Sequence, residues 1–204
     1  MSIYESHFLP RLTHLAMRQD LFVPYRRRVA SGAAGRVLEI GIGSGLNLAL
    51  YPDAVQTVIG VDPSPDLLRR AGQAARGSAR TTEMIEGVAE HLPLEDRSVD
   101  CVVATWTLCS VSDPNAALSE IRRVLRPDGA FRFVEHGLAP DPSVRKWQRR
   151  LTPLWKRCAG NCHLNRSTPD LLARNGFHIE RLETGYARGP KPFVFMSEGV
   201  ARIR

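Results

Sequence analysis

The sequence predicts an α/β fold whose centre is an open, mainly parallel β-sheet. Short apolar runs alternate with amphipathic helical patterns, and two runs, 37–40 and 99–105, are almost continuously apolar. Parallel strands show such runs because helices cover both of their faces. The first run leads directly into a glycine-rich turn at Gly41, Gly43 and Gly45. Because the chain has 204 residues, 43% of them hydrophobic, we expect one domain with a full core.

The glycine-rich turn is the most informative stretch. We expect a buried strand at 37–40, a tight turn at the three glycines and a helix that begins at 46–50. An open α/β sheet receives nucleotide-like ligands at a strand–turn–helix unit of this kind. Glycine lets the backbone adopt positive φ angles and approach the ligand closely.

Glu39 stands two residues before the first glycine of the turn. In a dinucleotide site this carboxylate would repel the pyrophosphate, and Leu46 stands where such a site needs its third glycine. A cationic ligand suits Glu39 better. S-adenosylmethionine (SAM), with its ammonium and sulfonium groups, is such a ligand. The alternative interpretation is a tight turn with a solvated Glu39.

The second strand, 57–62, ends at Asp62, about 20 residues after the glycine turn begins. An acidic residue at this distance accepts hydrogen bonds from ribose hydroxyls. The alternative is that Asp62 is only a helix cap. Prolines on both sides of Ser64 stop the strand, and we expect Ser64 to cap a helix at 66–75.

Apolar and helical patterns predict the remaining elements. We expect Asp113 and Thr168 to cap two helices and residues 126–129 to form the turn into the fifth strand. The expected strands are 83–86, 99–105, 130–135 and a closing antiparallel pair at 177–183 and 192–198, and the expected helices are 113–125, 144–157 and 169–175. The loops that leave parallel strands at their carboxyl ends should line the ligand site.

Residues 1–33 contain apolar side chains at helical spacing, followed by the triplet Arg26, Arg27 and Arg28. One interpretation is a helix packed on the sheet with a solvated basic face. The other is a helical lid over the ligand, with arginines that touch a membrane surface. We divide the single domain 1–204 into this lid and a core at 34–204.

Charge alone leaves several partners open. The formal charge is +7 and the isoelectric point is near 9.7, which favours nucleic acid, an anionic membrane or simply an arginine-rich composition. No basic patch interleaved with base-stacking aromatic residues is visible, so we expect no nucleic acid. We also expect no transmembrane segment, no signal peptide and a cytoplasmic location.

The four cysteines are Cys101, Cys109, Cys158 and Cys162. They predict no disulfide framework in a chain of this length. Cys158 and Cys162 lie four residues apart with His163 adjacent, which raises the question of a metal site. Because no second cysteine pair is evident, we expect no metal.

These motifs in combination resemble class I SAM-dependent methyltransferases over about residues 36–136. A closer resemblance is to the small thiol methyltransferases of animal microsomes, although we expect no N-terminal membrane anchor of the kind those relatives carry. Bacterial phospholipid N-methyltransferases of similar length are also similar. The closer resemblance rests on Tyr51-Pro52, Leu108-Cys109-Ser110-Val111, Glu135-His136, Trp155 and Gly160-Asn161-Cys162-x-Leu164-x-Arg166.

The resemblance implies a Rossmann-like seven-stranded sheet in the order 3-2-1-4-5-7-6, with the last strand antiparallel and helices on both faces. It implies SAM as cofactor, held by Glu39, Gly41, Gly43, Gly45, Asn47, Asp62, Pro63, Ala89, Glu90 and Thr105. We expect the acceptor to contact Tyr4, Trp106, Cys109 and Asn161.

His136 is the candidate for stabilising an acceptor thiolate or taking its proton, and Arg166 for supplying positive charge. A structural histidine at a strand end and a surface salt bridge are the alternatives for these two residues.

The function that the resemblance implies is methyl transfer from SAM to a small, largely apolar acceptor, most simply a thiol. A thiol is already a few per cent ionised at pH 7, so no obligatory base is needed. An N- or O-methyltransferase acting on a phospholipid or other metabolite is the alternative. A non-enzymatic nucleic-acid binder with this fold is a third possibility, and the absence of a base-stacking patch argues against it.

Overall fold

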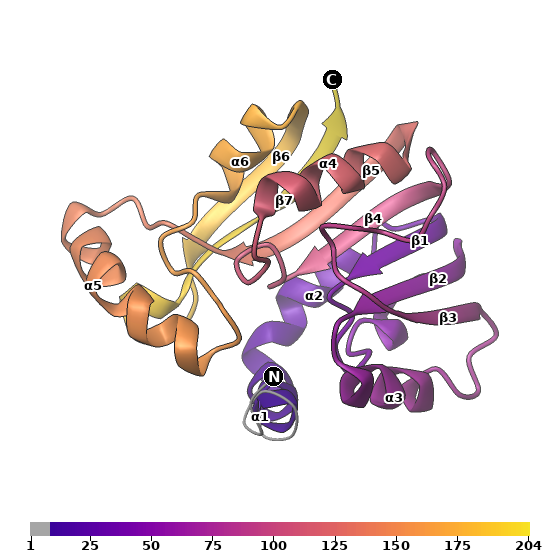
Figure 1. The fold of residues 1–204 in the computed structure, drawn as a ribbon, viewed down its shortest axis with the longest axis horizontal. Helices are drawn as coiled ribbons and strands as arrows, with labels where there is room; N and C mark the ends of the chain where they lie inside the picture. Colours follow the sequence, from indigo (N-terminus) through magenta and orange to yellow (C-terminus); the bar gives the residue numbers. More distant parts are fainter. Residues whose placement is uncertain (1–8) are drawn as a thin grey trace.

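A computed structural model describes residues 9–204. The centre is one seven-stranded sheet in the order β3-β2-β1-β4-β5-β7-β6, as predicted (Figure 1). Strand β7 runs antiparallel to both of its neighbours, and the other pairs are parallel. The strands are β1 (Gly35–Ile40), β2 (Val55–Asp62), β3 (Thr81–Glu86), β4 (Val99–Thr105), β5 (Leu125–His136), β6 (Phe177–Tyr186) and β7 (Phe195–Ile203).

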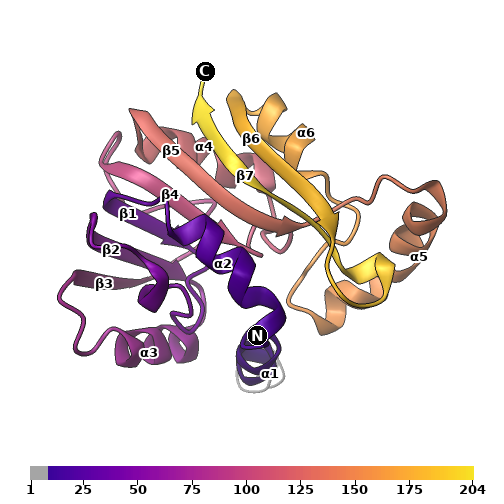
Figure 2. The ribbon, with the colours of Figure 1, turned by 180° about the vertical axis from the view of Figure 1, so that it is seen from behind.

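Helices cover both faces of the sheet. Helices α4 and α6 lie on one face and α2 on the other, whereas α5 projects beyond the ends of β6 and β7 (Figures 1 and 2). The helices are α1 (Leu9–Met17), α2 (Val23–Ala30), α3 (Pro65–Ala74), α4 (Pro114–Val124), α5 (Pro142–Cys158) and α6 (Thr168–Arg174), with short 3-10 helices η2 (Asp20–Phe22), η3 (Leu48–Leu50) and η4 (Lys191–Phe193). None of the helices in residues 9–204 is long and apolar enough to cross a membrane.

Strand β4 shows why its run is apolar at almost every position. Cys101 and Val103 belong to the core under α2 and α3, and Val102 and Ala104 belong to the core under α4 and α6. Successive side chains of a strand point to opposite faces, so a strand between two helical layers needs apolar residues at both. Cys101 is therefore a core residue.

The helix expected at 46–50 is wrong. The chain forms turns and then only the 3-10 helix η3, which ends at Leu50 and is followed by Tyr51. Tyr51 adopts an extended conformation, φ −68° and ψ 136°. The proline that follows disfavours the α conformation at Tyr51, and the tyrosine side chain is buried instead.

The helix caps are confirmed in two of three places. Ser64 accepts a hydrogen bond from the amide of Leu67, and Asp113 accepts from two amides at the start of α4. Thr168, by contrast, is the first residue of α6. The capping position belongs to Ser167, whose side chain makes no capping hydrogen bond.

The starts of two strands differ most from the expectation. The turn predicted at 126–129 is an irregular part of β5, which begins at Leu125. A β-carbon at Gly129 would lie 2.9 Å from the carbonyl oxygen of Asp100, so the close approach of β4 requires glycine there. The last strand begins at Phe195 and not at 192, because proline residues in and before η4 cannot donate ladder hydrogen bonds.

Candidate active site

The glycine turn after β1 has the backbone that the sequence predicts. Gly41, Gly43 and Gly45 have φ angles of 62°, 57° and 78°. A side chain at position 41 would overlap the hydroxyl of Thr107, so glycine lets the loop after β4 lie against the turn. A β-carbon at Gly43 would meet no atom closer than 4.0 Å. The turn is therefore closed at Gly41 and open at Gly43, where a ligand can approach.

Glu39 holds the turn from inside and is not solvated. The residue is 1% exposed, and its carboxylate accepts hydrogen bonds of 2.7 Å from both the Asn47 amide and the Tyr51 hydroxyl. Burial raises the pKa of Glu39 to about 7, although these hydrogen bonds and Arg26 oppose the rise. The alternative of a solvated Glu39 is therefore wrong, and the role of Glu39 is to organise the turn.

Arg26 of α2 joins the same network, which the sequence did not reveal. Its guanidinium donates hydrogen bonds of 3.2 Å to Asn47 and to Thr105, and it stacks 4.9 Å from the centre of the Trp106 ring. Burial lowers the pKa of Arg26 to about 10, while Glu39 opposes this. The side chain therefore remains charged at neutral pH and brings a buried cation to the turn.

The arginine triplet does not form a free basic face. Arg26 is buried, and Arg28 makes a two-bond ion pair of 2.6 and 3.0 Å with Glu198. Arg27 is exposed. Two of the three arginines that could touch a membrane are therefore engaged within the protein. A helix that packs on a sheet can direct only part of its circumference to solvent.

Asp62 connects the end of β2 to the glycine turn. Its carboxylate accepts hydrogen bonds of 2.9 Å from the amides of Gly43 and Ser64, and burial raises its pKa. Because Ser64 caps α3, Asp62 is not the cap. Pro63 follows it directly and is exposed. The geometry places an acidic group beside the open side of the turn.

The loop after β3 also meets this edge. Ala89 is buried, and the Glu90 carboxylate accepts hydrogen bonds of 2.8 and 3.2 Å from the amides of Ser112 and Asp113. Glu90 thus fastens this loop to the start of α4. That both residues border an adenine stays a prediction.

Glu135 at the end of β5 organises the loop after β4. It is fully buried, and its carboxylate accepts hydrogen bonds of 2.9, 3.0 and 3.1 Å from the amides of Thr107, Leu108 and Cys109. Burial raises its pKa to about 7, against the effect of these amides. Glu135 had no predicted role, although an acidic residue near the end of an apolar strand was a usable signal for a group that organises the next loop.

The N-terminal helices lie against this edge, as a lid would. Phe22 and Tyr25 pack edge-on against Trp106, with ring centres 4.9 and 6.3 Å apart. His14 of α1 lies 2.7 Å from the hydroxyl of Ser44 in the glycine turn. Tyr4, also expected to contact the acceptor, lies outside the described residues.

Three further side chains form a sulfur–imidazole cluster at the same edge. The Nδ1 atom of His136 lies 3.3 Å from the sulfur of Cys162, which shares a 3.6 Å hydrogen bond with the sulfur of Cys109. Both cysteines are buried. Cys158, whose spacing from Cys162 raised the question of a metal site, is exposed at the end of α5 and lies outside this cluster.

The cluster is electrostatically coupled. Hydrogen bonds from Cys109 and His136 lower the pKa of the Cys162 thiol, although burial opposes this. The hydrogen bond with Cys162, burial and the Glu135 carboxylate raise the pKa of Cys109. Burial acts to lower the pKa of His136, but Cys162 and Glu135 raise it overall. A thiolate at Cys162 and a charged imidazole thus favour each other.

Asn161 and Arg166 fasten the segment after α5 to the loop after β4. Asn161 has a φ of 64° and donates a 2.8 Å hydrogen bond to the carbonyl of Ser110. The Arg166 guanidinium donates to the carbonyls of Leu108 and Val111, the latter at 3.0 Å. Arg166 is not in a surface salt bridge among the described residues.

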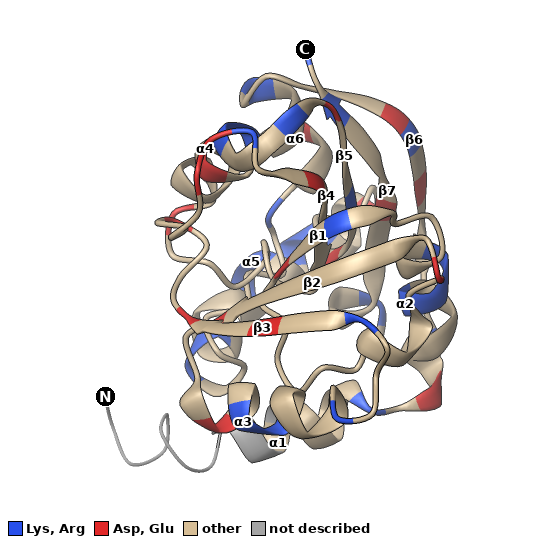
Figure 3. Ribbon diagram, turned by 90° about the vertical axis from the view of Figure 1, so that its right-hand side faces the viewer, with Lys and Arg blue, Asp and Glu red and all other residues tan. Residues whose placement is uncertain are grey.

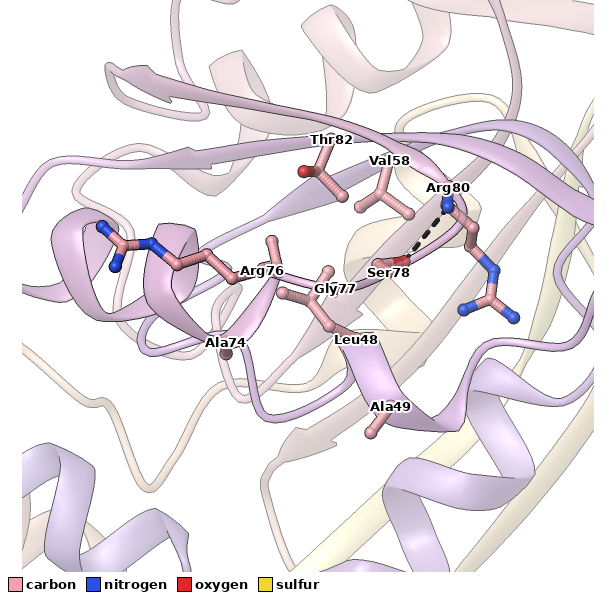
Figure 4. A pocket seen from close by; sticks show the side chains of 10 residues that line it. Leu48, Ala49, Val58, Ala74, Arg76, Gly77, Ser78, Arg80 and Thr82 are labelled. Carbon is pink, nitrogen blue, oxygen red and sulfur yellow. Dashed lines mark hydrogen bonds between the residues drawn. The ribbon is translucent and has the colours of Figure 1, made fainter.

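Two other features of residues 9–204 were weighed against this edge as ligand sites. Lys and Arg occur on several helices and strands, with Asp and Glu among them (Figure 3). A cavity of about 270 Å³ lies between η3, the end of α3 and the start of β3 (Figure 4). The guanidinium of its Arg80 already binds the Tyr51 carbonyl at 2.6 Å, and the cavity lies away from the carboxyl ends of the strands.

Comparisons with known proteins agree with this architecture. Residues 38–133 match the methyltransferase domain family. The thiol S-methyltransferase TMT1B of Rattus norvegicus is 33% identical over 186 residues, covering 89% of this chain and 74% of the relative. The phosphatidylethanolamine N-methyltransferase of Cereibacter sphaeroides is 37% identical over 116 residues, covering 54% of this chain and 57% of the relative.

Among solved structures, the YcgJ protein of Bacillus subtilis superposes with a TM-score of 0.70 at 19% identity, over 90% of this chain and 97% of that one. The residues of the edge fit SAM: the turn is open at Gly43, and acidic and cationic groups flank it at Asp62 and Arg26. The fold, the turn and the relatives together show that this chain belongs to the class I SAM-dependent methyltransferases, in the group that includes the thiol S-methyltransferases.

Proposed function

We propose that this protein transfers the methyl group of SAM to the thiol of a small, largely apolar molecule. The observation that carries the proposal is the make-up of the edge beside the glycine turn. Trp106, Phe22 and Tyr25 give it an apolar wall, and His136 gives it a positive group with a raised pKa. A small-molecule pocket is typically apolar with few polar groups, and several relatives carry the name thiol S-methyltransferase.

The cofactor residues take the roles that their positions suggest. Gly41, Gly43 and Gly45 shape the turn around the methionine part, and Asp62 with Pro63 faces the ribose. The Arg26 guanidinium donates hydrogen bonds to Asn47 and Thr105. Both residues are expected to hold SAM, and we assign Arg26 to the carboxylate of the methionine part. A guanidinium matches the geometry of a carboxylate with two parallel hydrogen bonds.

SAM supplies a methyl group on a positively charged sulfur. In the transfer, the bond from that sulfur to the methyl carbon breaks while the acceptor sulfur bonds to the same carbon, and the acceptor's proton leaves to solvent. The chain therefore has to align the acceptor and exclude water. Positive charge near a thiol raises its thiolate fraction, and His136 provides that charge at this edge.

Arg166 acts as a positioning residue in this account. Its guanidinium donates hydrogen bonds to loop carbonyls, so it fixes the loop that carries Cys109. Asn161, in the same segment after α5, fixes this loop at the Ser110 carbonyl.

Methylation of a phospholipid amine is the second candidate, because one relative has that activity in its name. Exposed apolar side chains on α1 and α5 (Leu12, Leu15, Trp147 and Leu154) would suit contact with lipid chains.

A screen with methyl-labelled SAM separates the two candidates. The acceptors are small thiols, amines, phenols and vesicles that contain phosphatidylethanolamine, and the Asp62→Ala variant is the control with a damaged cofactor site. We expect label on apolar thiols. Label on the lipid amine with none on any thiol would replace our proposal by the second candidate.

A further inference from the structure

Cys109, His136 and Cys162 come from three separate segments that the fold brings together. Cys109 lies in the loop after β4, His136 ends β5, and Cys162 follows α5. One potential ligand atom from each lies within 4.8 Å of the other two. They form the one such group of three or more His, Cys, Asp and Glu side chains in the part of the chain that the structure describes.

Two of the three separations within the cluster match tetrahedral zinc, and the third, between Cys109 and His136, is within 4.8 Å. Zinc binds cysteine sulfur at about 2.3 Å and histidine nitrogen at about 2.0–2.1 Å, which places two sulfurs about 3.8 Å apart and a sulfur and a nitrogen about 3.5 Å apart. The observed separations are 3.6 Å between the two sulfurs and 3.3 Å between Cys162 and His136. Shifts of a few tenths of an ångström at these two distances would admit the ion.

The backbone around the cluster is fixed before any ion binds. Glu135 accepts the amide hydrogen of Cys109, and the amide of His163 donates a 2.8 Å hydrogen bond to the Cys109 carbonyl. Pre-organised ligands of this kind support metal affinity. Glu135 itself is not available as a ligand, since its carboxylate is occupied by three amides.

Residues 9–204 thus offer three ligands, which leaves a fourth position without a ligand from this part of the chain. Structural zinc sites close with four protein ligands, whereas catalytic sites use three and keep one position for water or substrate. Cys109 lies two residues after Thr107, whose hydroxyl donates a 3.1 Å hydrogen bond to the carbonyl of Ile40 at the glycine turn, so the cluster is at the edge where the acceptor is expected.

We propose that Cys109, His136 and Cys162 bind a zinc ion whose fourth position takes the sulfur of the acceptor thiol. The metal site stands on geometry alone, and the acceptor's coordination rests on the proposed function. Two cysteine thiolates balance the charge of Zn²⁺, and His136 binds as a neutral imidazole, so in the zinc form the ion supplies the positive charge that the proposed function assigns to His136. The acceptor thiol loses its proton to solvent when it binds the ion, and the methylated product, a neutral thioether, is a weaker ligand and leaves. This proposal departs from the expectation of no metal, which was drawn from the spacing of Cys158 and Cys162.

A disulfide between Cys109 and Cys162 is the competing state of the same pair. It would need an oxidant, and it would leave His136 without a role. Zinc uses all three side chains.

Titration of the reduced, metal-stripped protein with Zn²⁺ or Co²⁺ tests the site. We expect one equivalent to bind, with sulfur-to-cobalt charge-transfer absorption in the Co²⁺ form. Cys162→Ala and Cys109→Ala should weaken binding at least about 100-fold. Cys158→Ser is the matched control, because that cysteine is exposed and outside the cluster, and it should bind normally.

His136→Gln keeps the test informative if either cysteine variant fails to fold, because His136 is only half-buried. It should also weaken binding while its circular dichroism stays that of the parent. Absence of stoichiometric metal binding in the parent, or isolation of the protein with a Cys109–Cys162 disulfide that no metal replaces, would overturn the site.

The open position is tested without turnover. Benzyl mercaptan added to the Co²⁺ protein in the absence of SAM should increase charge-transfer absorption, and benzylamine should not. An unchanged spectrum with the thiol would overturn acceptor coordination. Full-rate thiol methylation by metal-free protein would overturn the role of zinc and leave the proposed function standing. Absence of thiol methylation by the zinc-loaded protein would count against the proposed function and not against the metal site.

Discussion

Arg26 of the N-terminal helix α2 and Glu39 of the first strand bind opposite ends of one side chain, the amide of Asn47. The Asn47 oxygen accepts from Arg26 at 3.2 Å, and its nitrogen donates to Glu39 at 2.7 Å. Helix α2 and the glycine turn therefore share one buried polar network. This relationship joins the N-terminal segment to the turn that is expected to hold the cofactor.

Arg26→Ala should weaken SAM binding by about 1.5–3 kcal/mol, the range for hydrogen bonds to a charged group. The physical reason is the loss of the cation assigned to the methionine carboxylate. Calorimetric titration with SAM measures the effect. Arg27→Ala is the control, since Arg27 is the exposed neighbour. Equal affinities of the two variants for SAM would remove Arg26 from the site.

Asp62→Ala should also weaken SAM binding by about 1.5–3 kcal/mol. The variant loses the acceptor for the ribose hydroxyls and the hydrogen bond that holds the Gly43 amide. Asp53→Ala, at a fully exposed carboxylate, should bind SAM like the parent. Unchanged affinity in Asp62→Ala would show that Asp62 only supports the turn.

Glu39→Gln should change how stability depends on pH. The fold raises the pKa of Glu39 from its usual 4.5 to about 7, so it favours the protonated carboxyl. The stabilisation that comes from this raised pKa is fully present below pH 4.5 and is lost as the pH rises to 7. This loss lowers the free energy of unfolding by about 3 kcal/mol. Gln cannot ionise and avoids this loss.

The measurement is chemical denaturation of both proteins without SAM between pH 4 and 8. The free energy of unfolding of Glu39→Gln, minus that of the parent, should rise across this window. A difference that stays constant with pH would mean that folding does not raise the pKa of Glu39.

His136→Ala should lower turnover on a thiol while the affinity for SAM stays nearly constant, because His136 belongs to the acceptor side. The loss should shrink as pH rises toward the pKa of the acceptor, since solvent then supplies the thiolate. Steady-state rates at several pH values, with SAM titrations alongside, give both quantities. A variant as active as the parent at every pH would make His136 a structural residue.

Local patterns were sufficient to predict the central strands and the turn, whereas the order of the strands came from the resemblance. The runs around β1 and β4 face two helical layers, and the three glycines have the positive φ angles that such a turn demands. Asp113 caps α4 because a short acceptor before a helix acts within a few residues. Such signals lie in neighbouring residues, so they do not depend on how distant parts of the chain pack.

Burial of charge was not predictable in the same way. Arg26 looked like part of a surface triplet, and its burial depends on Asn47 and Thr105, which lie 21 and 79 residues away. Cys109 and Cys162 meet across 53 residues, whereas sequence spacing suggested Cys158. The edge shared by the parallel strands does bring Cys109 and His136 together, but the path of the segment after α5 was needed to add Cys162.

The central claim is methyl transfer from SAM to a thiol, and a competition reaction tests it most directly. The zinc-loaded protein is given deuterated-methyl SAM with equal amounts of benzyl mercaptan and benzylamine, and mass spectrometry identifies the products. We predict the deuterated methyl thioether together with an equal amount of S-adenosylhomocysteine. Formation of N-methylbenzylamine that carries the deuterated methyl group, with no thioether, would contradict methyl transfer to a thiol.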